Sequence, residues 1–407
     1  MRPLMVVFYA LAALVVLQSL LSLRGGVRYL NFFRRELEAP RALYMPFASV
    51  FVPCRGVDQG LRLNLLALFR QHYPAYELVF VSDRADDPAL EIARQLAREL
   101  EGETVARARF VVAGPAAESG QKVHNLRVAL KEADSSSEVF VFVDTDARPR
   151  ADWLRALVAP LADAGAGAAT GYRWFLPAGG GFASQLRSVW NASIASALGQ
   201  NVRGNFCWGG STAVRAETFG RLDMLRRWRG TVSDDYALTR ALQEARLPIR
   251  FVPACLNASV EDCTFRELFE FTTRQLKITR VYAPKLWGFV LVSNLLFVAV
   301  FFGGLALAGV RAAVGLPSVW PLVIVSVIFL LGMWKAFFRL RAVALVLEGH
   351  HGRLRAGLWA HLLLWPLTGA LFLYNALAAG LSRRIVWRGI GYELKSPTET
   401  EIIGPDA

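Results

Sequence analysis

The chain has 407 residues, a formal net charge of +13 and 54% hydrophobic residues. This length allows one large domain with a further part, or two to three small domains, and the apolar content is high for an entirely water-soluble protein. The positive charge does not indicate nucleic-acid binding, because no basic cluster interleaved with aromatic residues is present, and arginines beside apolar runs suit anionic lipid headgroups better.

The first predicted element is a membrane anchor at residues 1–24. Its uncharged run from Leu4 to Leu23 can cross a bilayer core of ~30 Å as a helix, at ~1.5 Å per residue. A signal peptide is the alternative, but Arg24 follows the run where a small-residue cleavage site is expected. The next stretch, residues 25–45, reads as a basic juxtamembrane linker.

Short β-rich runs then alternate with helical patterns through a predicted domain at residues 46–263. The expected strands are 48–54, 77–82, 106–112 and 138–143, and the expected helices are 60–70, 87–101 and 121–131. Apolar strands separated by helices predict an α/β fold with a mostly parallel sheet covered on both faces. Such sheets bind ligands at the carboxyl ends of their strands.

Acidic residues follow two of these strands. Asp83 comes directly after 77–82, and Asp144 and Asp146 come directly after 138–143. One aspartate at a strand end is often only a turn former, but two such ends on one sheet edge indicate a binding site. Carboxylates of this kind suit a hard cation, Mg²⁺ or Mn²⁺, that bridges phosphate oxygens. No glycine-rich phosphate loop occurs at these places, so we expect a metal to hold the phosphates.

A second acidic pair, Asp234 and Asp235, precedes an apolar helical pattern. Ser233 or Asp234 is suited to cap that helix, and acidic residues favour a helix N-terminus. Upstream, Gly209 and Gly210 allow close approach of the backbone, as a loop beside a bound ligand needs.

An alternative for the glycine pair is a simple turn into a strand. The neighbouring Trp208 has two readings that the sequence leaves open: it stacks against a sugar, or it belongs to the core.

The C-terminal part predicts membrane association. An amphipathic interfacial helix is expected at 264–285, and membrane helices at 286–382, before a tail at 383–407. The apolar runs within 286–382 are 286–310, 320–338 and 361–381. The third is interrupted by Pro366, which favours a re-entrant or interfacial segment, so two to three helices are expected.

Charge predicts the orientation in an inner membrane or its equivalent. Four arginines follow the anchor closely and only Arg2 precedes it, so the positive-inside rule places the N-terminus outside and the domain at 46–263 in the cytoplasm. Four cysteines without CxxC spacing agree with a reducing compartment.

Over residues 46–394 the sequence resembles the membrane-bound GT-A glycosyltransferases, and within them ceramide glucosyltransferase and its bacterial relatives. The stretches that carry the resemblance are 55-RGVD-58, 73-YPAYELVFVSDRADDPAL-90, 120-GQKVHNL-126, 141-VFVDTDA-147, 233-SDDYALTRAL-242 and 386-VWRGIGYEL-394. The resemblance implies a Rossmann-like catalytic domain that uses a nucleotide-sugar donor.

The resemblance also implies roles for individual donor-site residues. Asp83 would contact the uracil and ribose of a UDP-sugar, Asp144 would lie by the ribose and sugar, and Asp146 would hold the metal. Lys122 and Asn125 would line the nucleotide site.

On the acceptor side, Asp235 matches the family's catalytic base and Asp234 the acid before it. Trp208, Gly209 and Gly210 would belong to the acceptor and sugar region.

The chain departs from the family in 274-RQLKI-278. Arg274 fits the family pattern, but Lys277 replaces an arginine and Ile278 a tryptophan. Lysine keeps the positive charge for the donor diphosphate and lacks the planar fork of arginine. The same stretch is also explained as a membrane-surface helix with basic residues on headgroups.

These features predict inverting, metal-dependent transfer of a hexose, with glucose favoured, from a UDP-sugar to the hydroxyl of a membrane lipid. The lipid would be ceramide-like or another bacterial lipid. One alternative is a processive polysaccharide synthase, which the few spans and Ile278 disfavour. Another is a non-catalytic membrane scaffold with a glycosyltransferase fold, which the retained acids disfavour.

Overall fold

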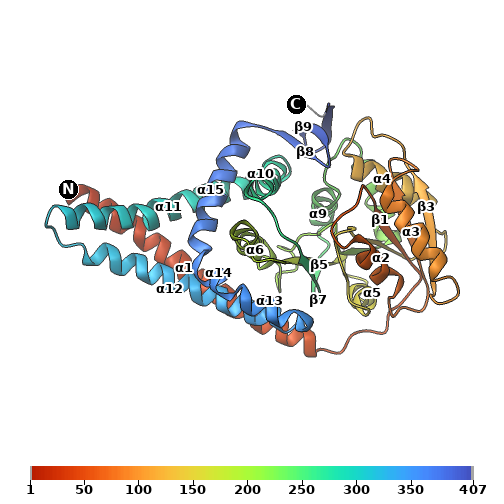
Figure 1. The fold of residues 1–407 in the computed structure, drawn as a ribbon, viewed down its shortest axis with the longest axis horizontal. Coiled ribbons are helices and arrows are strands. Elements are labelled where there is room, and N and C mark those ends of the chain that lie inside the picture. The colour runs from red at the N-terminus through yellow and green to blue at the C-terminus, as the bar shows by residue number, and fades with distance from the viewer. Residues whose placement is uncertain (1, 405–407) are drawn as a thin grey trace. The chain divides into compact units, whose positions relative to one another are not determined.

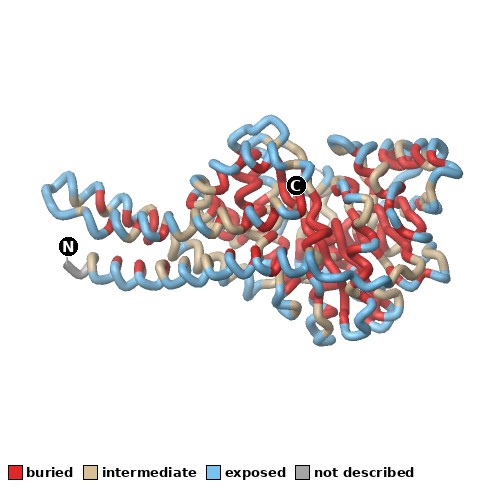
Figure 2. Tube along the Cα trace, turned by 90° about the horizontal axis from the view of Figure 1, so that it is seen from below, coloured by how far each residue is buried: buried red, intermediate tan, exposed pale blue. Residues whose placement is uncertain are grey.

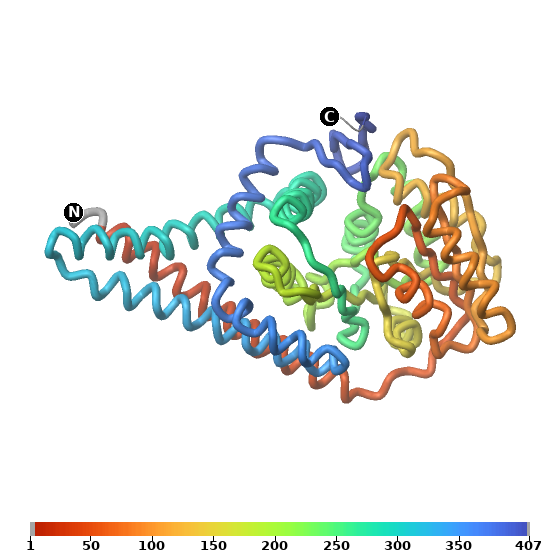
Figure 3. Tube along the Cα trace, viewed as in Figure 1, coloured from red at the N-terminus to blue at the C-terminus, as the bar shows by residue number. Residues whose placement is uncertain are grey.

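The computed structural model describes residues 2–404, which form two compact units (Figures 1 and 3). We call the first the helical unit: it contains the chain up to Arg34, Phe175–Ser196 and Val260–Ser382. The second, the sheet unit, contains Arg35–Trp174, Ala197–Ser259 and the chain from Arg383 onward.

The sheet unit is built on a seven-stranded sheet with the order β3-β2-β1-β4-β6-β5-β7. The strands are β1 Ala48–Pro53, β2 Tyr76–Ser82, β3 Ala106–Val112, β4 Val139–Phe142, β5 Ala168–Leu176, β6 Thr212–Arg215 and β7 Ile249–Val260. Strands β1 to β4 pair in parallel, whereas β6 runs antiparallel to both β4 and β5. The predicted mostly parallel α/β sheet is confirmed.

Burial and helix capping explain the first half of this unit. All seven residues of β2 are buried, as expected for a strand covered on both faces, and Figure 2 shows the buried segments in red. The connecting helices are α2 Leu61–Phe69, α3 Pro88–Glu99 and α4 Gln121–Ala129. Helix α3 begins where Asp87 accepts the Ala89 N–H at 2.9 Å, with proline in the first turn.

The remaining parts of the sheet unit are short helices and a small second sheet. The helices are α5 Trp153–Val158, α7 Ala216–Arg221, α8 Met224–Arg227 and α9 Asp234–Glu244. The second sheet has the order β10-β9-β8, with strands β8 Arg384–Trp387, β9 Ile390–Ser396 and β10 Glu399–Ile403. Tyr392 and Leu394 of β9 are almost fully buried, so this sheet packs firmly.

The helical unit contains three helices long and apolar enough to cross a membrane: Met5–Glu38, Pro284–Ala313 and Val319–Ala344. They lie in α1 Arg2–Glu38, α11 Pro284–Ala313 and α12 Val319–Ala344; the other helices are α6 Phe182–Ala195, α10 Phe265–Tyr282, α13 His351–Ala356, α14 Leu358–Leu363 and α15 Trp365–Leu381. One N-terminal and two C-terminal membrane helices agree with the prediction.

One helix boundary differs from the expected one, and one interruption lies where it was expected. Helix α1 does not end near residue 24 but continues to Glu38, so residues 25–38 of the expected linker are helical. Gly26 allows this continuation to pack closely, because a Cβ there would lie 3.3 Å from the Lys335 backbone. The run 361–381 is divided between α14 and α15, where Pro366 occupies the first turn of the second helix.

The predicted interfacial helix corresponds to α10. It begins with a capping box between Thr264 and Glu267. Leu268, Leu276 and Ile278 are buried while Phe265 and Phe269 are exposed, as the amphipathic pattern predicts. Ile278 is therefore a packing residue of the helical unit.

Candidate functional site

Three neighbouring parallel strands carry charged side chains just beyond their carboxyl ends. Arg55 follows β1, Asp83 follows β2, and Asp144 and Asp146 follow β4. Because β1 lies between β2 and β4, these residues share one sheet edge, as expected from the sequence. Arg55 Nη1 lies 2.7 Å from Asp83 Oδ2, so the guanidinium that follows β1 forms an ion pair with the carboxylate that follows β2.

Lys122 connects this edge to the second acidic pair. It lies in the first turn of α4, with its Nζ atom 2.8 Å from Asp144 Oδ1 and 3.2 Å from Asp234 Oδ1. Burial acts to lower the pKa of Lys122, but Asp144, Asp234 and Asp235 raise the pKa well above its usual value. The ammonium group therefore remains charged, and the two acidic groups form one site.

Gly209 makes this close approach of charges possible. A Cβ atom at this position would lie 2.5 Å from Asp234 Oδ2 and 2.7 Å from Lys122 Nζ, far inside ordinary contact distances. A Cβ at Gly210 would instead meet the ring of Trp208. The glycine pair thus lets the backbone pass beside an ion pair and an indole.

The two aspartates at the start of α9 have different environments. Ser233 is the N-cap and accepts the Tyr236 N–H at 3.2 Å. Asp234 is only 4% exposed, and its burial, opposed by Lys122, raises the pKa of its carboxyl to about 6.

Asp235 is half-buried, and its Oδ1 accepts the Tyr236 N–H at 2.8 Å and the Ser233 hydroxyl. No hydrogen bond from residues 2–404 reaches its Oδ2. Asp234 is thus held in an ion pair, while Asp235 keeps an oxygen for a ligand.

The two aspartates of the Asp-Thr-Asp motif, Asp144 and Asp146, also have different environments, which shift their pKa values in opposite directions. Burial raises the pKa of Asp144, but Lys122, helped by Arg173 and Arg388, lowers the pKa below its usual value. Burial raises the pKa of Asp146, although Arg173 opposes it. Arg173 Nη1 lies 2.8 Å from Asp146 Oδ2, and its guanidinium stacks 5.1 Å from the Trp208 ring.

The second oxygen of Asp146 fits a metal site. Asp146 Oδ1 is buried and has no hydrogen-bond partner among the described residues, which is costly unless a ligand approaches. Within residues 2–404 no group of three or more His, Cys, Asp and Glu side chains could hold a metal alone. Mg²⁺ is commonly held by one or two carboxylates together with substrate phosphates, and that is the ligand set available here.

The other predicted residues lie at the margin of this cluster or outside its unit. Asn125 is buried one turn along α4 from Lys122, where its Oδ1 accepts a hydrogen bond from Gln121 at 2.8 Å. Arg274 and Lys277 lie on α10 in the helical unit. Arg280, a basic residue one helical turn beyond Lys277 that was not assigned to the site, donates to the Ala379 carbonyl at 2.6 Å.

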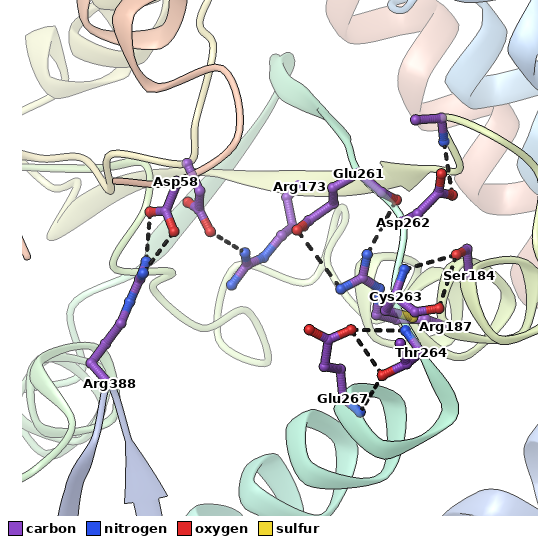
Figure 4. A network of polar contacts seen from close by, with 12 residues as sticks. Asp58, Arg173, Ser184, Arg187, Glu261, Asp262, Cys263, Thr264, Glu267 and Arg388 are labelled. Atoms are coloured by element: carbon purple, nitrogen blue, oxygen red, sulfur yellow. Dashed lines mark hydrogen bonds and ion pairs between the residues drawn. The ribbon is translucent and has the colours of Figure 1, made fainter. Parts of the chain in front are cut away.

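Four further charged residues of the sheet unit contact the predicted site residues or lie next to them. They are Arg55, Asp58, Arg173 and Arg388, and the last pairs with Asp58 through both guanidinium nitrogens (Figure 4). The stretches 55-RGVD-58 and 387-WRGIGY-392 contained a signal for three of them. Arg173 lies inside a buried strand, where the sequence offered no signal.

Comparison with known proteins identifies related sequences and folds. A family model described as glycosyl transferase family 21 matches residues 6–400. A solved mannosyltransferase from Pyrobaculum calidifontis, in complex with GDP-Man and Mn²⁺, has 17% identity, a TM-score of 0.47, and coverage of 91% of this chain and 98% of that one. Glucosyl-3-phosphoglycerate synthase from Mycobacterium tuberculosis, with Mn²⁺ and UDP-glucose, has 14% identity, a TM-score of 0.35, and coverage of 62% and 82%.

Proposed function

The chain belongs to glycosyl transferase family 21 and its sheet unit has a mostly parallel α/β sheet, and we propose that it transfers a hexose from a UDP-sugar to the hydroxyl of a membrane lipid, with inversion. Glucose is the first candidate for that hexose. The acceptor is ceramide-like or another bacterial lipid. The observation that carries the proposal is the position of Lys122 between Asp144 and Asp234. It supports one site with a donor side and an acceptor side.

On the donor side, Asp83 would bind the uracil and ribose, and Asp144 the ribose and sugar. Lys122 and Asn125 would line the nucleotide site, with Arg274 and Lys277 serving the diphosphate. Asp146 would hold the divalent metal, Mg²⁺ or Mn²⁺, through the oxygen that lacks a protein partner. When bound, that metal would neutralise charge developing on the departing diphosphate.

On the acceptor side, Asp235 would act as the general base. The lipid hydroxyl oxygen would bond to the anomeric carbon from the face opposite the diphosphate, and the bond from that carbon to the diphosphate oxygen would break. The hydroxyl proton would pass to Asp235, and UDP would leave. The half-exposed position of Asp235 and its available oxygen support this role, whereas the ion pair of Asp234 suits a positioning role.

The arginines that follow the N-terminal apolar run support an orientation for this reaction. The catalytic sheet unit would face the cytoplasm and the N-terminus would lie outside, following the positive-inside rule.

The decisive experiment compares lipids of cells with and without the gene by mass spectrometry. A hexosylated lipid that is absent from the deletion strain, and that the purified protein makes from a UDP-sugar and lipid vesicles, is the expected result. A lipid profile without any missing hexosylated species contradicts the proposal, and a product with many added hexoses points to a polymerase.

A further inference from the structure

The C-terminal tail places an arginine at the tip of a tight hairpin. Strands β8 and β9 pair up to Trp387 and Ile390, which leaves a two-residue turn of Arg388 and Gly389. Their φ angles are 52° and 76°, both left-handed, as a type I′ turn requires. Asparagine, aspartate or glycine is favoured at such positions, and strained residues of other types concentrate at functional sites.

The hairpin is anchored without help from this arginine. The Tyr392 hydroxyl accepts the Gln121 N–H at the start of α4 at 3.1 Å. The Thr398 carbonyl lies so close to Gly230 that a Cβ there would overlap it. The side chain of Arg388 is therefore not needed to hold the turn in the sheet unit.

The guanidinium of Arg388 lies close to the Asp-Thr-Asp motif. Its Nη1 and Nη2 atoms each lie 2.6 Å from an oxygen of Asp58 (Figure 4). Asp58 Oδ2 also accepts a hydrogen bond from Thr145 Oγ1 at 3.4 Å, and Thr145 is the central residue of the motif.

The Arg388 carbonyl accepts a hydrogen bond from Arg55 Nε at 3.2 Å, and Arg55 in turn holds Asp83. The turn therefore contacts residues next to both acidic strand ends.

We propose that Arg388 binds the diphosphate of the nucleotide-sugar donor, and that it leaves Asp58 to do so. This inference rests on the function proposed above. A planar guanidinium matches phosphate oxygens as well as it matches a carboxylate. The Arg388 side chain is 41% exposed and the Asp58 side chain 22%, so solvent weakens the pair and a ligand can reach it.

The proposal accounts for the replacement at Lys277. Lysine provides a point charge for a diphosphate, whereas a bidentate contact needs arginine. Arg388 supplies that fork from the sheet unit itself. Hydrogen bonding to Asp58 is the main cause that raises the pKa of Arg388, and Asp146 and Asp144 add to it, which agrees with a position of Arg388 beside the donor side.

The test measures calorimetric binding of UDP, UMP and uridine, with Mn²⁺, to the full-length protein in detergent. The Arg388→Ala variant should bind UDP about 10- to 100-fold more weakly, with UMP and uridine changed far less. The UDP affinity of Arg388→Lys should lie between those of the wild type and Arg388→Ala. Arg384→Ala is the matched control, since Arg384 lies on the same hairpin and pairs with Glu393 at 3.4 Å, and it should bind UDP normally.

A second variant separates ligand binding from a structural role. Asp58→Asn removes the competing carboxylate, so it should bind UDP at least as tightly as the wild type. If Arg388 is only a structural ion-pair partner, Arg388→Ala and Asp58→Asn will both weaken the binding of UDP and of uridine to the same extent. If the wild type binds UDP and Arg388→Ala binds it equally well, this inference alone is overturned. If the wild type binds no UDP, the proposed function is overturned as well.

Discussion

Lys122 Nζ lies 3.2 Å from Asp234 Oδ1, at the point where α4 meets the start of α9. The same atom lies 2.8 Å from Asp144 Oδ1. One half-buried cation is therefore shared by the sheet edge expected to bind the donor and the helix expected to act on the acceptor. A ligand that displaces Asp144 or Asp234 from Lys122 changes the ion pair of Lys122 with the other aspartate. The two sides of the site are therefore electrostatically coupled.

Replacement of Asp235 by asparagine should abolish transfer and preserve donor binding. The amide cannot accept the acceptor proton, and general-base catalysis typically contributes about 10²- to 10⁴-fold. UDP release with lipid vesicles and UDP affinity by calorimetry would be measured together. Glu244→Gln, at the exposed end of the same helix, should keep wild-type rates. Undiminished turnover in Asp235→Asn would reject the base assignment.

Replacement of Gly209 by alanine should disrupt the charge cluster. Its Cβ would lie 2.5 Å from Asp234 Oδ2 and 2.7 Å from Lys122 Nζ, so the ion pair must shift. We expect a loss of about 1–3 kcal/mol in the free energy of unfolding and a fall in transfer rate of about 10²-fold. The control is Gly199→Ala, where no atom lies within 4 Å of the new methyl group. Equal behaviour of the two variants would contradict the assigned role of Gly209.

The pKa of Asp234 gives stability a defined pH dependence. Burial raises this pKa to about 6, above the value of about 3.9 in an unfolded chain. The folded protein then binds the proton more tightly, so the contribution of Asp234 to the free energy of unfolding decreases as pH rises from about 4 to about 6. The melting-temperature difference between wild type and Asp234→Asn should decrease over this window and stay constant above it.

Glu244 provides an opposite control for that measurement. Hydrogen bonds from Arg240 and Arg227 lower the pKa of Glu244, so its contribution appears as pH rises and is lost in acid. The difference between wild type and Glu244→Gln should therefore not decrease with rising pH. A pH-independent difference for Asp234→Asn would show that its carboxyl titrates normally.

Asp146 should determine the response to divalent metal. Its Oδ1 is buried without a hydrogen-bond partner among the described residues, so Asp146→Asn should raise the Mn²⁺ concentration needed for UDP binding at least about tenfold. Mn²⁺ titration followed by electron paramagnetic resonance measures binding without turnover. Asp86→Asn, whose side chain is 83% exposed, should titrate like the wild type. Identical titrations for both variants would remove Asp146 from the metal site.

Single cysteines can test the orientation. Leu43→Cys lies at an exposed position of the sheet unit and Val314→Cys at the end of α11. A membrane-impermeant maleimide should label the second in intact cells, and the first only after permeabilisation. The four native cysteines are free, with three buried and Cys263 half-buried, so the unsubstituted protein is the background control. The reverse labelling pattern would invert the proposed topology.

The sequence alone determined the first four strands and the helices between them, the acids at two of the strand ends and the apolar helices. These features depend on local patterns: side-chain burial sets the period of each element, and parallel strands bring their carboxyl ends to one edge. Strands β5, β6 and β7 were not predicted from the sequence. It also predicted that Ser233 or Asp234 caps α9, and the structure assigns the cap to Ser233.

Only the tertiary structure decided which charges meet. Arg388 and Asp58 are 330 residues apart in sequence, and Arg173 reaches Asp146 from inside a buried strand. The continuation of α1 to Glu38 likewise depends on packing, since Gly26 lies against the backbone of Lys335. Ion pairs and close contacts between distant segments follow from how the elements pack, and no local sequence pattern encodes that arrangement.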